Sequence, residues 1–182
     1  MDNYRAIAQG ILNQVTGCLS TADPQTFARL AQALAGQRAI FVAGEGRAEA
    51  VGRAFASALA RLGRDVHVVG ESTATGIGSG DLLFALSPGG ASPVTAGRLD
   101  LARRVKATTV VITGDANAPI LEKADLAVVL LPGTRTPYSD SPGAGAYLLF
   151  AQALMVYLDA LVIALAQATG RNSFSVPGIP LD

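Results

Sequence analysis

Short apolar runs alternate with longer amphipathic segments along this chain. The runs occupy residues 39–43, 66–69, 81–86, 108–113 and 126–131. Within each run most successive residues are apolar, rather than every second one, which is typical of strands buried on both faces. Because segments with helical spacing separate the runs, the pattern predicts an α/β fold in which helices cover both faces of a parallel sheet.

The intervening segments carry recognisable helix starts and stops. Residues 2–19 place apolar side chains on one helical face, and Asp23, followed by proline, begins a second helix that ends at Gly36. A third helix ends with Gly63 as its C′ residue. Ser92, also followed by proline, has the chemistry of an N-cap and begins a fourth helix.

Residues 147–168 form an unusually apolar segment that is long enough to cross a bilayer. Asp159 near its middle, with Gln152 and Gln167, argues against a membrane span. We therefore expect a helix that is buried in the core or between subunits. A loop rich in Gly, Pro and Ser precedes it at 132–146, and connections of that length are usually functional or mobile.

The length of 182 residues suits one domain with a sizeable core, and we find no internal repeat. The expected parts are N-terminal helices at 2–35, an α/β core at 39–131, a loop at 132–146, and a C-terminal helix at 147–168 with a tail. We therefore expect a single domain over residues 1–182.

Charge and composition narrow the function classes. Fourteen basic residues balance fourteen acidic ones and tryptophan is absent, so neither nucleic acid nor an anionic membrane surface is expected as a partner. One cysteine, Cys18, and one histidine, His67, argue against a disulfide, a metal site and a Ser-His-Asp triad. The few charged residues predict apolar surface buried between subunits. No signal peptide is visible, so we expect a cytoplasmic protein.

The stretch with the clearest chemistry is 81–92, DLLFALSPGGAS. A strand leads into a Gly/Ser loop and then a helix, an order that aims free backbone N–H groups and the positive end of a helix dipole at one point. Ser87 and Ser92 add hydroxyl donors, and Gly89 and Gly90 allow a phosphate to approach the backbone. The alternative is a plain turn in which Ser92 only caps its helix.

Two further loops, 44–47 and 113–117, leave the carboxyl ends of predicted strands. In open parallel sheets, ligands bind outside these ends, where the strand order reverses. The convergence of three such loops favours an anion site over plain turns.

A dinucleotide site is the alternative for the first of these loops. Gly44-x-Gly46 follows a strand, and Glu71 at the end of the next strand stands where a ribose-binding acid would lie. Glu49, however, occupies the place of the third glycine in that fingerprint. The match is partial, and a partial match of this kind is weak evidence for NAD.

The successive motifs resemble those of the SIS (sugar isomerase) domain family. They read FVAGEGRAEAVGRAFASALARLGRDVHVVGE, then GDLLFALSPGGAS, then VVITGDANAPILEKAD, and are similar in particular to the 6-phospho-3-hexuloisomerases. The resemblance implies a three-layer sandwich with a five-stranded parallel, flavodoxin-like sheet and no metal or other cofactor. It also implies a sugar-phosphate ligand, conversion of a 3-hexulose 6-phosphate to fructose 6-phosphate, and a homodimer or homotetramer, which we expect to form through the first and last helices.

The family's phosphate loop is only partly kept. It typically reads Ser-Gly-Ser-Gly-Glu-Thr, which Ser87, Gly90 and Ser92 match in kind. Gly89 and Ala91 replace a serine and the glutamate. The residues that the resemblance and the loop chemistry assign to the phosphate are Gly44, Gly46, Arg47, Ser87, Gly89, Gly90, Ser92 and Thr113.

The catalytic groups of the hexuloisomerases are less well matched. Ala48 follows the first loop where the family usually has serine, and Phe150-Ala151 stands where a Phe-Glu pair would supply the base. The tail has no histidine, and His67 lies within a strand, which is more typical of a packed residue than of a proton shuttle.

Glu45 is the first candidate for a replacement base, because a carboxylate beside a phosphate site must be used or neutralised. The alternative is an ion pair of Glu45 with Arg47. Other candidate bases are Glu71, Tyr157 and Asp159, and Arg135 is a candidate for closing over the ligand. Two functions remain open: a phosphosugar isomerase, and a sugar-phosphate sensor or binding subunit that has lost its base.

Overall fold

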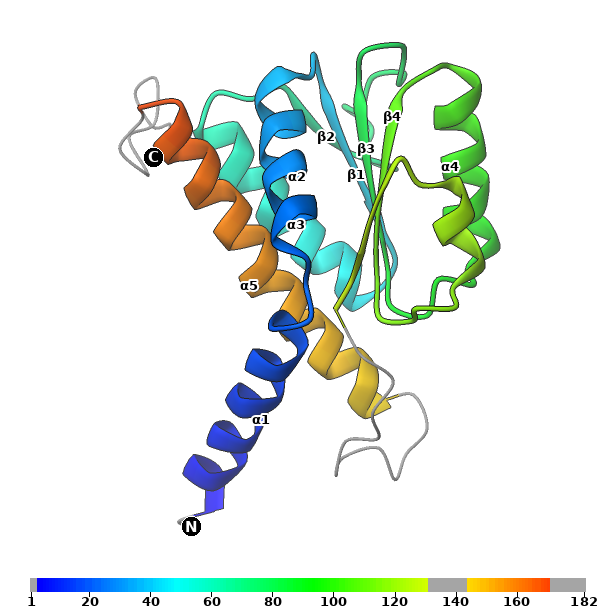
Figure 1. Cartoon of the computed structure of the whole chain (residues 1–182). Helices are drawn as coiled ribbons and strands as arrows, with labels where there is room; N and C mark the ends of the chain where they lie inside the picture. The colour runs from blue at the N-terminus through cyan, green and yellow to red at the C-terminus, as the bar shows by residue number, and fades with distance from the viewer. Residues whose placement is uncertain (1–2, 131–143, 171–182) are drawn as a thin grey trace.

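The computed structural model describes residues 3–130 and 144–170. Five strands form one parallel sheet in the order β2-β1-β3-β4-β5 (Figure 1). The strands are β1 (Ile40–Gly44), β2 (Val66–Val68), β3 (Leu82–Ser87), β4 (Thr108–Thr113) and β5 (Leu126–Val129). The predicted five-stranded parallel sheet is confirmed, and each expected strand lies within two residues of its observed bounds.

Helices cover both faces of the sheet, as the apolar runs predict. One face carries α2 (Pro24–Gly36), α3 (Arg47–Arg61) and α5 (Ala144–Ala168), joined by the end of α1 (Asn3–Leu19). The other face carries α4 (Pro93–Arg104) and the short 3₁₀ helix η1 (Pro119–Lys123). The result is the three-layer α/β sandwich that the resemblance implies.

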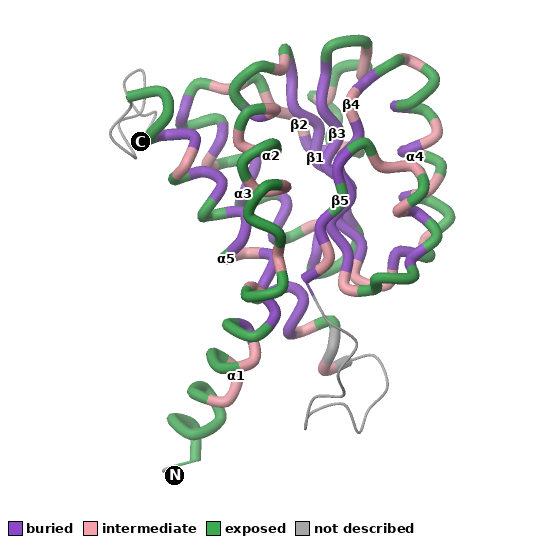
Figure 2. The backbone as a smooth tube through the Cα atoms, viewed as in Figure 1, coloured by how far each residue is buried: buried purple, intermediate pink, exposed green. Residues whose placement is uncertain are grey.

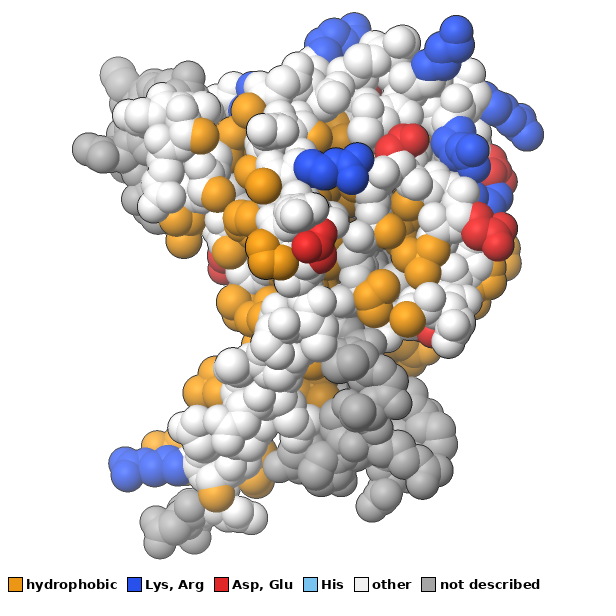
Figure 3. All heavy atoms as spheres, viewed as in Figure 1, with side chains coloured by type: hydrophobic (Ala, Val, Ile, Leu, Met, Phe, Trp, Pro, Cys, Tyr) orange, Lys and Arg blue, Asp and Glu red, His pale blue; other side chains and the backbone are white. Residues whose placement is uncertain are grey.

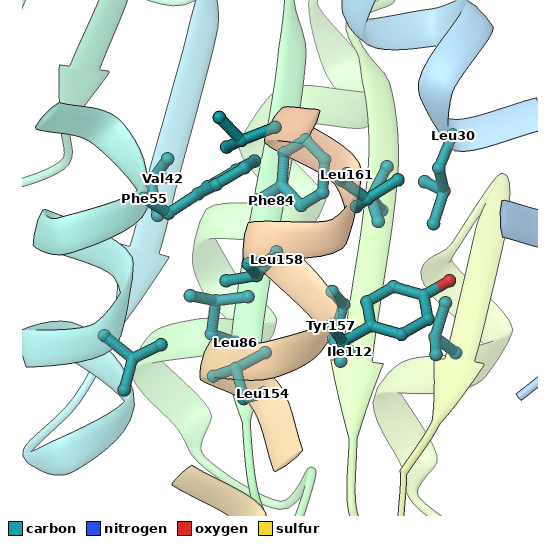
Figure 4. Packing of buried hydrophobic residues seen from close by; sticks show 14 of the residues in the cluster. Leu30, Val42, Phe55, Phe84, Leu86, Ile112, Leu154, Tyr157, Leu158 and Leu161 are labelled. Carbon is teal, nitrogen blue, oxygen red and sulfur yellow. The ribbon is translucent and has the colours of Figure 1, made fainter. Parts of the chain in front are cut away.

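The larger core lies between the sheet and α5. Leu154, Leu158 and Leu161 of α5 point toward the strands (Figure 4). The rings of Phe55 and Phe84 meet edge to face, with their centroids 5.3 Å apart. The central strands β1 and β3 are buried throughout, whereas edge strand β5 alternates between buried and more exposed residues (Figure 2). Burial on both faces explains why the central strands lack polar alternation.

Capping residues explain where several helices begin and end. Asp23 caps α2 by accepting hydrogen bonds from the N–H groups of Gln25 and Thr26, and Gly63 has a φ of 73° after α3, as a C′ glycine requires. Helix α5 begins at Ala144, three residues earlier than predicted. The rest of the 132–146 loop, with Arg135, and the tail after residue 170 lie outside the described residues.

Helix α5 is the one described helix that is long and apolar enough to span a membrane, by length and composition. In the structure, 56 % of its most apolar window is buried, and the helix packs against α1, α2 and α3. Buried core helices of globular proteins have the same composition. This packing agrees with the expectation of a buried helix.

Helix α1 projects from the body of the molecule, and only its C-terminal half meets α5 (Figures 1 and 2). Its outer residues Tyr4, Ile7 and Leu12 are 66 %, 42 % and 59 % exposed. Apolar side chains are visible on this helix in the space-filling view (Figure 3). Helix α1 therefore presents an apolar surface that the described chain leaves uncovered.

Candidate functional site

A cavity of about 760 Å³ opens at the carboxyl ends of β1 and β3. Its lining comprises residues 45–48 and 86–92, with Tyr147, Leu148 and Phe150 from α5. Strands β1 and β3 are neighbours, but the helices that follow them, α3 and α4, lie on opposite faces of the sheet. The cavity thus lies at the switch point where ligands bind in open α/β sheets.

The first wall is the β1–α3 loop, which two glycines shape. A side chain at Gly44 would place its Cβ 2.9 Å from the backbone nitrogen of Glu49. Gly46, at a φ of 58°, is the N-cap of α3 and supplies no side-chain cap. The backbone N–H groups of Arg47 and Ala48 therefore begin a helix without an acceptor in the described chain, and both residues line the cavity.

The second wall is the β3–α4 loop. Gly90 has a φ of 59°, and a Cβ there would lie 2.2 Å from the Cβ of Ala118. Ser87 is 5 % exposed, and its hydroxyl makes no hydrogen bond to another described residue. The N–H groups of Gly89, Gly90 and Ala91 are equally without an acceptor in this part of the chain. The loop therefore offers several polar donors to a ligand.

The third predicted loop lies beneath the second and does not reach the cavity. Thr113 is fully buried, and its hydroxyl donates to the carbonyl oxygen of Pro88 at 3.3 Å. The N–H of Gly114 donates to the same oxygen at 2.9 Å. The structure thus places Thr113 outside the cavity lining, where it holds the 87–92 loop in shape.

Glu45 connects the two walls. Its Oε1 accepts a hydrogen bond from the Ser92 hydroxyl at 2.8 Å, and the Ser92 oxygen in turn accepts from the N–H of Thr95 at 3.3 Å. Among the described residues that line the cavity, Glu45 is the only carboxylate. Both Glu45 and Arg47 are described, and the structure contains no ion pair between them, so the partner of Glu45 is Ser92.

Arg47 supplies the positive charge of the cavity. It is exposed, it begins α3, and it forms no ion pair with another described residue. A guanidinium without a carboxylate partner beside two helix N-termini favours an anionic ligand.

Sequence reasoning missed the wall that α5 supplies. Tyr147 is 48 % exposed and lines the cavity, and its hydroxyl lies 3.7 Å from where a Cβ on Gly89 would be. Leu148 and Phe150 complete this wall. The only signal was a tyrosine at the start of an apolar helix, immediately after a Gly-rich loop.

The other base candidates lie elsewhere. Ala151, where the resemblance places a glutamate, is 5 % exposed and packs in the larger core. Glu71 forms an ion pair with Arg53 and lines a separate, smaller cavity, so Glu71 and Gly46 do not share the site that a dinucleotide would need. Asp159 is exposed on α5.

His67 and Tyr157 are packed residues outside the cavity. The His67 ring stacks on the Phe41 ring, with the two centroids 5.0 Å apart, and its Nε2 lies 3.1 Å from Oδ1 of Asp65. Tyr157 is 4 % exposed and its hydroxyl has no partner in the described chain; burial, reinforced by the charge of Asp23, raises the pKa of Tyr157 to about 12. Among the described residues, no group of three His, Cys, Asp or Glu is placed to hold a metal ion.

Sequence comparison identifies the family. The model of the SIS domain matches residues 33–164. The chain belongs to the SIS domain family. It is 31 % identical over 153 residues to the 3-hexulose-6-phosphate isomerase of Mycobacterium gastri, covering 83 % of this chain and 76 % of that enzyme. It is 26 % identical over 168 residues to the Bacillus subtilis protein of the same name, covering 90 % and 89 %.

Solved structures share the fold of this SIS domain. A hypothetical protein from Methanococcus jannaschii, whose structure was taken to infer a 3-hexulose-6-phosphate isomerase function, superposes with a TM-score of 0.81 at 21 % identity over the whole of both chains. The Vibrio vulnificus NanR protein, solved with ManNAc-6P, superposes with a TM-score of 0.76 at 21 % identity, covering 93 % of this chain and 64 % of NanR. The protein is thus a phosphosugar isomerase-like SIS domain, similar to 3-hexulose-6-phosphate isomerases at low identity.

Proposed function

We propose that the protein is a cytoplasmic isomerase that binds a sugar phosphate in the 760 Å³ cavity and interconverts a 3-hexulose 6-phosphate with fructose 6-phosphate. The observation that carries the proposal is that the N-termini of α3 and α4 meet one carboxylate, Glu45, in a single cavity. Anions bind readily at helix N-termini, and a carboxylate is a suitable general base. The names of the relatives supply the substrate class.

The phosphate lies, in this proposal, against the 87–92 loop. The Ser87 hydroxyl and the N–H groups of Gly89 and Gly90 donate to its oxygens, and Arg47 balances its charge. Each helix N-terminus adds about 0.3–1 kcal/mol of stabilisation for a nearby anion. These donors do not depend on Ala48 and Ala91, which replace polar residues of the family pattern.

The chemistry requires one group that both takes and returns a proton. Glu45 abstracts the proton from C2, next to the C3 carbonyl, and an enediol forms when the C3 oxygen is protonated. Return of the proton to C3, with loss of the O2 proton, gives the C2 ketone of fructose 6-phosphate. No atom is gained or lost. Tyr147 lines the same cavity, and in this proposal its hydroxyl exchanges protons with the sugar oxygens.

Ser92 links phosphate binding to this base. Its single hydroxyl proton is donated to Glu45 in the structure. A phosphate oxygen at the start of α4 competes for that donor, because a dianion is the stronger acceptor. Phosphate binding then releases the Glu45 carboxylate toward the sugar.

The second candidate function is a sugar-phosphate sensor or binding subunit without turnover. Ala151 in the core favours it, because the position that supplies the base in the resembling enzymes here carries a methyl group outside the cavity. The fold also occurs in the sugar isomerase domain of an RpiR transcription factor from Sphaerobacter thermophilus, at a TM-score of 0.74 and 18 % identity.

A coupled isomerase assay with Glu45→Gln separates the two functions. We expect wild-type turnover, and a loss of about 10²–10⁴-fold in kcat for the variant, because a positioned base contributes that much. Glu122→Gln is the matched control, since Glu122 is exposed and outside the cavity. Fructose 6-phosphate binding without wild-type turnover would establish the binding subunit instead.

We also propose that the protein is a homodimer or homotetramer assembled through α1 and α5. The uncovered apolar residues of α1 and the exposed Val156 and Ile163 of α5, at 46 % and 47 %, support this assembly. Apolar side chains that remain exposed in one subunit are stabilised when a second copy covers them.

A further inference from the structure

A second cavity, of about 300 Å³, lies on the sheet face opposite α3 and α5. Its floor is formed by Phe41 of β1 and Leu83 of β3, which are each 2 % exposed. One wall is the segment 69–77 and the other is Arg98 and Leu101 of α4. Its volume is at the lower end of the range of small-molecule sites.

The wall segment belongs to a connection that the proposed isomerase reaction does not use. Residues 69–81 join β2 to β3 and contain neither helix nor strand. Their sequence, VGESTATGIGSGD, is rich in Gly, Ser and Thr, with Gly70 and Gly80 at φ values of 101° and 83°. A connection of this length without secondary structure is uncommon in a compact fold and usually serves a function.

Arg98 carries the uncompensated charge of this cavity. Its only hydrogen bond in the described chain runs from Nη1 to the carbonyl oxygen of Gly44, at a long 3.5 Å, and it forms no ion pair there. Glu71, the one carboxylate in the described lining, pairs with Arg53, which also binds Glu49, and not with Arg98. A partly buried guanidinium is therefore available to an anion at the edge of an apolar floor.

We propose that this cavity is a second ligand site, which binds a small organic monocarboxylate with an apolar body. The carboxylate pairs with Arg98, whose planar guanidinium matches it in two parallel hydrogen bonds. The apolar body covers Phe41 and Leu83, and Leu101, which is 53 % exposed, closes over it. A single unpaired guanidinium balances one negative charge, which favours a carboxylate over a phosphate dianion.

The test uses 3-phenylpropanoate as the probe and 3-phenylpropan-1-ol as its neutral analogue. Binding is followed by methyl NMR of the full chain, with Ile77, Leu83 and Leu101 as reporters. We expect these methyl groups to shift on titration, and the carboxylate to bind at least about tenfold more tightly than the alcohol. Equal affinity for the two probes, or shifts confined to Leu86 and Leu148 of the larger cavity, would overturn the proposal.

Two variants locate the site. Arg98→Gln is expected to lower the affinity for the carboxylate at least about tenfold and to leave the affinity for the alcohol unchanged. Arg104→Gln, on the same helix, is expected to leave both affinities unchanged. Unchanged affinity for the carboxylate in Arg98→Gln contradicts the site.

Discussion

Gly90 illustrates how one residue shapes the candidate site. Gly90→Ala forces a side chain into left-handed backbone, at about 1–2 kcal/mol, and against Ala118, where overpacking costs about 1–3 kcal/mol more. We therefore expect a clear fall in the free energy of unfolding, measured by urea denaturation, and weaker sugar-phosphate binding.

Gly89→Ala is the matched control for this prediction. Its backbone lies outside the left-handed region, and its Cβ would make only an ordinary contact, 3.7 Å from the Tyr147 hydroxyl. Both variants add the same methyl group, but only Gly90→Ala strains the backbone and crowds Ala118. Equal free energies of unfolding for the two variants would contradict the prediction.

A second residue-scale prediction concerns the ion pair between exposed Arg38 and buried Asp81, at the opposite end of β3. Arg38 donates to both oxygens of Asp81 at 3.0 Å, and the Asp81 side chain is 1 % exposed. Burial alone would raise the pKa of Asp81, but hydrogen bonds from Arg38 and from the N–H of Gly78 lower it below its ordinary value. Arg38→Met removes a charged donor from the buried Asp81 carboxylate and is expected to lower the free energy of unfolding at pH 7.

The pH dependence of this loss has a definite sign. Because the folded-state pKa of Asp81 lies below the unfolded value of about 3.9, the stabilisation is present above that pH and disappears as pH falls through the folded-state pKa. The free energies of unfolding of wild type and Arg38→Met, measured by urea denaturation, should therefore converge at acidic pH. Arg104→Met, at an exposed arginine, should track wild type throughout; a gap that persists in acid would refute this role for Asp81.

At the scale of elements, the β3–α4 loop is expected to hold the phosphate. Ser87→Ala together with Ser92→Ala should weaken fructose 6-phosphate binding at least about tenfold, because two hydroxyl contacts near a dianion are lost. Loss of the Ser92 cap should also cost about 1 kcal/mol of stability. Calorimetric titration measures the first effect and urea denaturation the second.

The control for the serine pair is Ser72→Ala with Ser79→Ala, at two exposed serines outside both cavity linings. This control also removes two serine hydroxyl groups, but from a different loop. If the Ser87 and Ser92 variant kept the wild-type affinity, the loop would not be part of the binding site.

Secondary structure followed from the sequence because its signals are local. Asp23 and Ser92 cap helices with their own side chains, and the apolar runs mark strands buried on both faces. The start of α5 was placed three residues late, because the Gly and Ala residues before Tyr147 have no helical pattern of their own.

The candidate site was harder to predict because it depends on distant contacts. The two wall loops were expected from strand order, and the structure brings them together. The Glu45–Ser92 hydrogen bond joins residues 47 positions apart, and no local pattern indicates it. Thr113 was assigned to the cavity because its loop leaves the right end of a strand, whereas its side chain turns beneath that loop. Tyr147 was missed because helix patterns do not show which end of the sheet a helix reaches.

At the scale of the whole molecule, α1 makes the proposed assembly testable. Ile7→Asp with Leu12→Asp places two charges on its exposed apolar face, and we expect the oligomer to dissociate to monomers in sedimentation velocity at micromolar concentration. Gln9→Asp with Asn13→Asp adds the same charge at exposed polar positions of the helix and should leave the oligomer intact. A monomeric wild-type protein would contradict the assembly directly.

The central claim is that a sugar phosphate occupies the cavity between β1 and β3. Calorimetric titration of the wild-type protein with fructose 6-phosphate, beside a parallel titration with fructose, tests it most directly. We expect saturable binding of the phosphorylated sugar, no measurable binding of fructose, and loss of affinity in the Ser87 and Ser92 double variant. Absence of binding, or equal binding of the two sugars, would show that the cavity is not a sugar-phosphate site.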